Sequence, residues 1–197
     1  MVKMILPTLM HGHVKITDLT ENRVLVDKDN QIHYENMSVS LANCVSGVGG
    51  GSIKSMAFGR GGTSVDVTGI ITYLPPNTNT QQSDLYLQSY SKVINQFSGE
   101  NTDPINNKME IRHLAGEVYT DILISCLLDY NEPSGQDAFD TAEDTDGTYV
   151  FDELGIKSSE DKLLTHVIFH PIQKSLNRLI QIDYTIRIQT LTNLSGV

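Results

Sequence analysis

A strict alternation of apolar and polar residues marks positions 180–189. Every second residue in this stretch is apolar, and the residues between them are Gln, Asp, Thr or Arg. The apolar positions are Ile180, Ile182, Tyr184, Ile186 and Ile188. A β-strand with one buried face has this side-chain period of two, and a helix does not. The pattern therefore predicts a half-buried strand that ends close to residue 190.

Two hairpins are predicted from shorter alternating stretches. Residues 14–34 contain short repeats of apolar and polar residues, and the polar residues 27–30 are expected to form a turn. Residues 108–130 contain a second pair of stretches around an Ala-Gly turn. The second arm of this hairpin has Leu123 and Leu127 on the face opposite its other apolar residues. Because both faces are then partly apolar, we expect this arm to be a central strand of its sheet.

Apolar residues at helical spacing predict two α-helices. Residues 36–46 have an apolar face, with Asn36 as a candidate N-cap and Gly47 directly after the last turn. Residues 84–97 have a second apolar stripe, which begins after a candidate cap at Asp84. We therefore expect two helices in an otherwise extended chain.

These elements predict a mainly β protein of the α+β class. We expect antiparallel sheets in a sandwich-like arrangement with two helices, and further short strands at residues 53–58 and 69–74. At 197 residues the chain is long enough for one sizeable core, so a single β-rich domain is expected over residues 14–197. Residues 131–148 are acidic and contain Gly, which predicts a long exposed loop.

Residues 1–13 are expected to form an extended N-terminal arm. They include several apolar residues, but these residues follow no helical or strand pattern. We therefore expect their side chains to be buried only when the protein assembles. Two histidines flank a Gly in this arm, and no third metal ligand is close in sequence. The candidate interface residues of the arm are Met4, Leu6, Leu9, Met10, His11 and His13.

A second histidine pair is a further candidate for contact with a neighbouring subunit. His166 and His170 share one phase of a predicted strand, opposite the face of Val167 and Phe169. The alternative is that they are two half-exposed imidazoles on a sheet.

The formal net charge of -10 narrows the range of partners. Proteins that bind nucleic acid gain most of their affinity from clustered Lys and Arg, so nucleic acid is not an expected partner. The sequence contains neither a signal-peptide pattern nor an apolar run of about 20 residues, so no membrane contact is expected. Cys44 and Cys126 lack metal-type spacing. We expect both to be buried free thiols in a protein that assembles in a reducing cytoplasm.

One acidic segment is similar to a calcium-binding loop. Asp144, Asp146 and Glu153 match positions 3, 5 and 12 of such a loop, where short-spaced oxygens and a distal carboxylate surround the cation. Position 1, however, is Ala142, and the flanking residues do not predict a pair of helices. We keep the three acids as the only metal candidates and interpret the segment as a solvated acidic loop.

No group of residues predicts a catalytic site. Residues 59–62 contain three glycines, but no Lys-Ser/Thr follows them and no helix begins there. We therefore interpret this segment as a tight turn and not as a phosphate-binding loop. Asp152 and Glu153 point to opposite faces of a strand and cannot converge on one substrate atom. No Ser lies in a nucleophile motif, and Cys126 lies in a strand interior. We expect no catalytic residue, no cofactor and no enzymatic activity.

Four segments, in this order along the chain, carry a resemblance to a known family. They are Ile53 to Gly62, Leu85 to Tyr90, Phe151 to Ile156 and Leu163 to Lys174. In this order they resemble the attachment domain of bacteriophage tail-fibre and tail-collar proteins. Residues 32–38 are also similar to a segment that recurs in structural proteins of large phages. Those fibre proteins usually continue into a repetitive shaft, which does not follow here.

The resemblance implies a non-enzymatic structural protein of a phage virion. It would be an attachment or adaptor module of the tail, collar or neck, assembled in the host cytoplasm as a homo-oligomer. Its partners would be copies of itself and other virion structural proteins. Two alternatives stay open, a head-decoration or capsid-cement protein and a calcium-dependent binding module. Copy number per particle distinguishes the first, and sensitivity of the melting temperature to chelators distinguishes the second.

Overall fold

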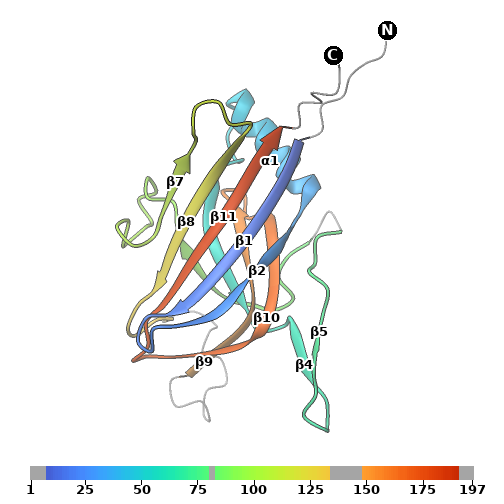
Figure 1. Cartoon of the computed structure of the whole chain (residues 1–197), viewed down its shortest axis with the longest axis vertical. Coiled ribbons are helices and arrows are strands. Elements are labelled where there is room, and N and C mark those ends of the chain that lie inside the picture. The colour runs from blue at the N-terminus through green and yellow to red at the C-terminus, as the bar shows by residue number, and fades with distance from the viewer. Residues whose placement is uncertain (1–7, 80–82, 134–147, 191–197) are drawn as a thin grey trace.

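A nine-stranded antiparallel sheet forms most of the molecule in the computed structural model, which describes residues 8–79, 83–133 and 148–190. The strand order is β6-β3-β9-β10-β2-β1-β11-β8-β7, and β4 and β5 form a separate two-stranded sheet (Figure 1). The elements are β1 (Thr8–Asp18), β2 (Arg23–Ile32), α1 (Tyr34–Ser46), β3 (Ile53–Gly59), β4 (Thr63–Val65), β5 (Ile71–Tyr73), β6 (Gln88–Val93), β7 (Lys108–Arg112), β8 (Tyr119–Leu128), β9 (Thr148–Ser158), β10 (Leu163–Ser175) and β11 (Ile180–Thr190).

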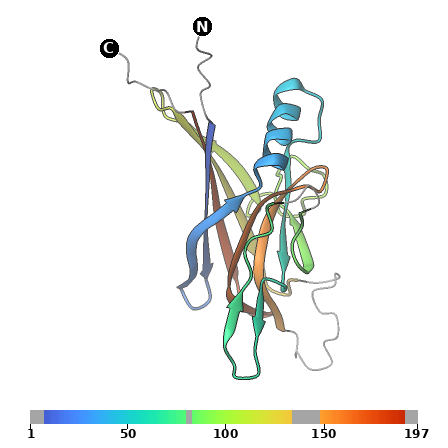
Figure 2. The same cartoon turned by 90° about the vertical axis from the view of Figure 1, so that its right-hand side faces the viewer.

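The large sheet curls so that its two halves face each other, as Figure 2 shows from the side. The halves join where β10 pairs with β2 through only two residue pairs, Thr165 with Ile32 and His166 with Gln31. The strands β6, β3, β9 and β10 form one half, and β2, β1, β11, β8 and β7 form the other. The mainly β, antiparallel prediction is therefore confirmed, and the arrangement of the two halves is sandwich-like.

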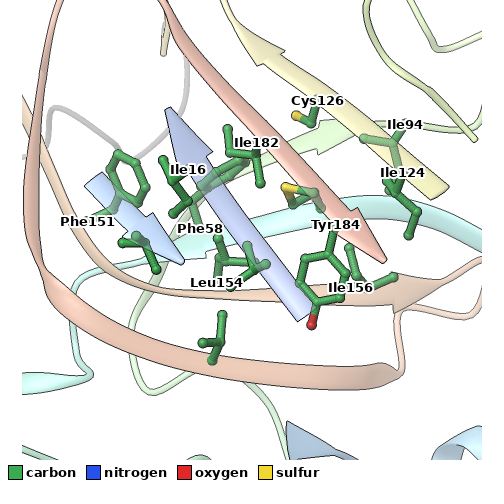
Figure 3. Close-up of a cluster of buried hydrophobic side chains, with 14 of the residues drawn as sticks. Ile16, Phe58, Ile94, Ile124, Cys126, Phe151, Leu154, Ile156, Ile182 and Tyr184 are labelled. Carbon is green, nitrogen blue, oxygen red and sulfur yellow. The ribbon is translucent and has the colours of Figure 1, made fainter. Parts of the chain in front are cut away.

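The core fills the space between these halves (Figure 3). Ile16 and Ile182 come from one half, and Phe58 and Leu154 come from the other, all without exposed surface. Aromatic rings contact one another in this core, with centroids 5.5 Å apart for Phe58 and Phe151. Burying each such side chain contributes about 1.5–3 kcal/mol, so the core supplies most of the driving force for folding.

Polar side chains bridge the sheet where its two edges approach each other. The Gln96 side-chain amide donates to the Met109 carbonyl (2.8 Å) and accepts from the Met109 N–H (2.9 Å), as a neighbouring strand would. The Lys92 ammonium donates to the Leu127 carbonyl at 2.6 Å. These contacts connect the β6 side of the sandwich to β7 and β8 without a continuous ladder of strand hydrogen bonds.

The predicted strand at residues 180–189 is confirmed as β11. Every second residue of this strand from Ile180 to Ile186 is buried in the core, namely Ile180, Ile182, Tyr184 and Ile186. The hairpin predicted from residues 14–34 is also present, but its turn lies at residues 19–22 and not at 27–30. The Asp18 carboxylate accepts from the Thr20 N–H (2.8 Å) and the Glu21 N–H (3.1 Å) and so stabilises that turn. Residues 27–30 lie within β2.

The second predicted hairpin is confirmed as β7 and β8, with one difference. The residues Ile124, Cys126 and Leu128 of β8 are buried as expected. However, β8 lies next to the edge strand β7 and is not central. Leu123 and Leu127 are only partly buried, so their apolar character does not indicate a covered second face.

The prediction of two helices is wrong, because the residues described contain one α-helix. Residues 84–97 include β6, which pairs with β3. Asp84 does not begin a helix there, and its carboxylate lies 2.9 Å from the buried ammonium of Lys157. Pairing with β3 in the tertiary structure overrides the helical spacing of the apolar residues.

The helix α1 begins two residues earlier than predicted. Its N-cap is His33, whose Nδ1 accepts from the Asn36 N–H at 3.2 Å. Asn36 instead donates its side-chain amide to the Leu163 carbonyl at 2.9 Å. Gly47 ends the helix as expected, with a φ of 70° in the left-handed region, where glycine avoids the strain of a Cβ.

The predicted boundary of the N-terminal arm at residue 13 is wrong. Thr8 to His13 form the first half of β1, which pairs with both β11 and β2. Met10 is buried in the core, and residues 1–7 lie outside those described. A Cβ on Gly12, between the two histidines, would lie 1.7 Å from the Asn30 side-chain oxygen, so a larger residue there would have to displace the Asn30 side chain. Most of the predicted acidic loop, residues 134–147, also lies outside the described residues.

Candidate functional site

A buried carboxylate, that of Glu153 in β9, is the centre of a dense cluster of hydrogen bonds. Its Oε1 accepts from the backbone N–H groups of Leu87 (2.8 Å) and Gly61 (3.1 Å). Its Oε2 accepts from the Tyr86 N–H (2.9 Å) and lies 3.0 Å from Nε2 of His166. Neither Glu153 nor His166 has exposed surface. We call these five residues the Glu153 clamp.

The protonation of His166 follows from its second contact. Nδ1 of His166 accepts from the Asn77 N–H at 2.8 Å. A backbone amide can only donate, so Nδ1 carries no proton, and the ring proton lies on Nε2. His166 therefore donates to Glu153.

The pKa of Glu153 is lowered despite its burial. Burial alone raises the pKa of a carboxyl group, because it disfavours the charged form. The hydrogen bonds from His166, Leu87 and Tyr86 outweigh burial here and hold the pKa of Glu153 below its usual range. The carboxylate therefore stays ionised inside the protein and holds three separate segments together.

Asp152 binds the same glycine-containing loop, residues 59–63, as the adjacent Glu153. One carboxylate oxygen accepts from the Gly62 N–H (2.9 Å), and the other accepts from the Thr63 N–H (2.9 Å) and the Thr63 hydroxyl. The two adjacent acids thus share no donor, but they bind consecutive residues of one loop. Because carboxylates of the protein occupy these N–H groups, the loop is a structural turn and not a free phosphate cradle.

Close approach explains one glycine of this loop. A Cβ on Gly59 would lie 2.4 Å from Oε1 of Glu153 and 2.6 Å from the Leu87 carbonyl oxygen. The loop can fold around Glu153 only with glycine at that position.

All four segments that carry the sequence resemblance meet in the Glu153 clamp. Residues 53–62 provide Gly61, residues 85–90 provide Tyr86 and Leu87, residues 151–156 provide Glu153, and residues 163–174 provide His166. Three of them form the adjacent strands β3, β9 and β10. The resemblance segments therefore build one connected structural unit.

A buried lysine stabilises the beginning of the long acidic segment. The ammonium of Lys174, which has no exposed surface, donates to the carbonyls of Glu132 (2.8 Å), Asp129 (2.9 Å) and Ser175 (3.0 Å). Burial lowers the pKa of Lys174 to about 8, although the nearby Glu132 and Asp129 favour its charged form. Lys92 also pairs with the Glu132 carboxylate.

The metal candidates are not brought together by the described part of the chain. Asp144 and Asp146 lie outside the described residues, and Glu153 is fully engaged in its clamp. Within residues 8–79, 83–133 and 148–190, no group of three or more His, Cys, Asp or Glu side chains has the spacing to hold a metal ion.

The predicted interface residues divide into accessible and inaccessible positions. His166 is buried because segments around Asn77 and Tyr86 cover its face of β10, so the prediction of a partly exposed imidazole is wrong there. His170 is exposed and lies 3.2 Å from the Tyr73 hydroxyl. His11 is exposed, and Nε2 of His13 lies 2.9 Å from the Asp27 carboxylate. Met10 is in the core, Leu9 is half-buried, and Met4 and Leu6 lie outside the described residues.

Cys44 differs from its prediction, whereas Cys126 agrees with it. Cys44 is exposed on α1, and Cys126 is buried in β8. Burial raises the pKa of the Cys126 thiol to about 12. Only Cys44 is therefore accessible for chemistry at neutral pH.

Two exposed apolar surfaces are not predicted by the sequence patterns. The first, the projecting hairpin, consists of residues 63–74 and exposes Val65, Val67, Ile70 and Tyr73. The second, the end groove, is a hollow of ≈ 320 Å³ between α1 and the strands β7, β8 and β11. Large exposed apolar patches on a soluble domain mark interaction sites.

The end groove is assembled from the helix α1, the five strands β3, β7, β8, β10 and β11, and loop residues. Its apolar lining includes Leu41, Ile53, Phe97, Ile111, Ile122 and Ile188. No residue of the lining is charged. Phe97 and Ile111 on its rim are 89% and 79% exposed, so the groove is open to a partner.

Comparisons with protein family models, with curated proteins and with solved structures found no match to this chain. In the described residues, no helix is long and apolar enough to cross a membrane.

Proposed function

We propose that this chain is a non-enzymatic structural protein of a phage virion, an attachment or adaptor module of the tail, collar or neck. It assembles with copies of itself and with other virion proteins. The observation that carries this proposal is the convergence of the four resemblance segments on Glu153. The clamp residues that these segments provide are hydrogen-bonded to one another and connect neighbouring strands. This is the role expected of a structural framework that the members of a family have in common.

The contacts within the clamp favour a structural role over a catalytic one. The Glu153 oxygens bind the protein's own N–H groups and His166, and both nitrogens of that histidine are also engaged. A general acid or base must reach a substrate atom within hydrogen-bond distance. A substrate could reach this pair only if the segments around Asn77 and Tyr86 moved away.

The exposed apolar surfaces support assembly with other chains. The chain is acidic, with a formal net charge of -10, yet it exposes apolar side chains in the projecting hairpin and at the end groove. An isolated protein gains nothing from such surfaces, whereas a subunit buries them on assembly.

Labelling of intact particles tests the proposal. Antibodies raised against the purified chain, coupled to gold, should bind to virions of the source phage at the tail, collar or neck. Labelling spread over the head surface would instead support a head-decoration protein. If purified virions contained none of this chain, the proposal would be overturned.

The N-terminal residues provide a second test. We propose that residues 1–7 contact a neighbouring virion protein, because the apolar residues Met4 and Leu6 directly precede β1 in the sequence. Deletion of residues 1–7 should leave a protein that melts normally but is not incorporated into particles. Deletion of residues 191–197 is the control of equal length. Normal incorporation after the N-terminal deletion would contradict the role of the arm.

A further inference from the structure

The end groove and the projecting hairpin lie at opposite ends of the molecule. Figures 1 and 2, which share the long vertical axis, both place α1 at one end and the hairpin of β4 and β5 at the other. A chain therefore cannot place its own hairpin in its own groove. Two identical copies can make this contact head to tail, and each copy then has a free hairpin and a free groove for the next one.

The turn of the hairpin is fixed before any partner binds. Oδ1 of Asp66 accepts from the Thr68 N–H (2.7 Å), the Thr68 hydroxyl (2.6 Å) and the Ile70 N–H (3.0 Å). The Asp66 N–H also donates to the Ile70 carbonyl at 3.0 Å. A preorganised turn loses little conformational entropy on binding.

The Glu153 region anchors the base of the hairpin. Asp152 binds the N–H groups of Gly62 and Thr63 where the hairpin begins. At the other end of the hairpin, the Leu74 N–H donates to the Gly62 carbonyl at 2.9 Å. The hairpin is therefore a rigid projection of the framework, and Val67 is fully exposed at its turn.

The two surfaces match in polarity. Asp66 is the only Asp, Glu, Lys or Arg in residues 63–74, and its Oδ1 is engaged within the turn. The groove lining has no charged residue. The chain as a whole is acidic, with a formal net charge of -10, but these two surfaces can meet without bringing two carboxylates together.

We propose that the projecting hairpin of one copy inserts Val67 and Ile70 into the end groove of the next copy. The contact is heterologous, so it builds a closed ring or a continuous stack of subunits. It identifies the partner surface for the self-assembly in the proposed function, and it rests on that function only for the expectation that copies associate.

A native thiol in the groove makes the contact testable by crosslinking. Cys44 lines the end groove and is exposed, whereas Cys126 is buried in β8. A Val67→Cys variant would place a second reactive thiol at the hairpin turn. With oxidised glutathione as the two-electron oxidant, the two thiols form a disulfide and the glutathione is reduced. We expect a ladder of disulfide-linked multimers on a non-reducing gel.

Two control variants separate specific insertion from random collision. The double variant Val67→Cys/Cys44→Ser lacks the groove thiol and should give no ladder. Glu21→Cys places a thiol in the β1–β2 turn, which lies toward the hairpin end in both views (Figures 1 and 2), and should also give no ladder. Dimers that persist without Cys44 would mean that two hairpins meet each other, which would overturn the proposal.

A second measurement uses no covalent link. Val67→Asp should weaken self-association in analytical ultracentrifugation at least about tenfold, since a charge would have to enter an uncharged groove. Its melting temperature should stay unchanged, because Val67 is fully exposed. Unchanged self-association would refute the proposal. A disulfide of Leu6→Cys with Cys44, without one from Val67→Cys, would show that the N-terminal segment occupies the groove instead.

These experiments use the purified full chain. Results that contradict the contact between copies would not affect the proposal that the chain is a virion protein. Absence of the chain from virions would not affect the proposed contact between copies.

Discussion

The Glu153 clamp and the projecting hairpin have opposite relations to solvent. The clamp buries a carboxylate and an imidazole with every polar contact made inside the chain. The hairpin exposes Val67 and Ile70, whose side chains have little to contact within the same chain. Buried polar groups whose hydrogen bonds are all made stabilise and specify a fold. A cluster of exposed apolar groups instead indicates a surface that binds another molecule. The difference separates the framework of this protein from the contact surface that we propose for it.

The same substitution at a buried and an exposed position gives the largest contrast. Ile182→Asp places a charge in the core between the sheet halves and should reduce the free energy of unfolding by about 4–5 kcal/mol or prevent folding. Val67→Asp should leave that free energy within about 0.5 kcal/mol of the wild type. Urea denaturation followed by circular dichroism measures both. A stable Ile182→Asp protein would contradict the assignment of the buried face of β11.

Removal of the clamp carboxylate should have the next largest effect. Glu153→Ala leaves buried N–H donors and the His166 ring without an acceptor, so we expect a loss of about 3–5 kcal/mol. Glu110→Ala is the control, since that carboxylate pairs with Lys108 on the surface. Its effect on the free energy of unfolding should be much smaller, because solvent screens this exposed pair. Similar values for the two variants would show that the clamp does not stabilise the fold.

The clamp should also make the free energy of unfolding depend on pH. The pKa of Glu153 is lower in the folded chain than its usual value, so its stabilisation is complete at neutral pH and is lost as the pH falls through the folded pKa. The wild type should therefore lose more free energy of unfolding between about pH 6 and pH 3 than Glu153→Gln does.

Asp18 and Asp121 contribute to the same acid response, because hydrogen bonds from Arg178 and Arg187 lower their pKa values. For this reason the difference between wild type and variant is the informative quantity. An identical acid dependence in the two proteins would contradict the role of the Glu153 carboxylate.

The smallest effect concerns the two cysteines. Cys44 should react with a thiol reagent at neutral pH, whereas Cys126 should react about 100-fold more slowly or only after unfolding, because its thiol is buried and its pKa is about 12. Mass spectrometry of the labelled chain measures both rates. If self-association fills the end groove, Cys44 should also react more slowly at high protein concentration. Two fast thiols would contradict the burial of β8.

The strands predicted best from the sequence are those whose two faces differ. In β11 the side chains alternate strictly, so residues 180–189 are identified correctly. In β10 both faces are buried from Leu163 to Phe169, one in the core and one under the segments around Asn77 and Tyr86. The sequence pattern does not show this cover, and it therefore predicts the accessibility of His166 wrongly.

The clamp could not be predicted because most of its donors are backbone groups. The N–H groups of Gly61, Tyr86 and Leu87 have the same chemistry in any residue, so their positions leave no trace in the side-chain pattern. A hint was available in the adjacent acids Asp152 and Glu153 beside a predicted glycine-rich turn. The end groove combines residues far apart in sequence, such as Leu41 and Ile188, which meet only in the folded chain.

An electron cryo-microscopy map of the intact particle, at a resolution that traces this chain, tests the central claim most directly. We expect the chain in the tail, collar or neck, with the projecting hairpin of each copy in the end groove of its neighbour. A particle without this chain, or a chain found only on the head lattice, would contradict the proposed function.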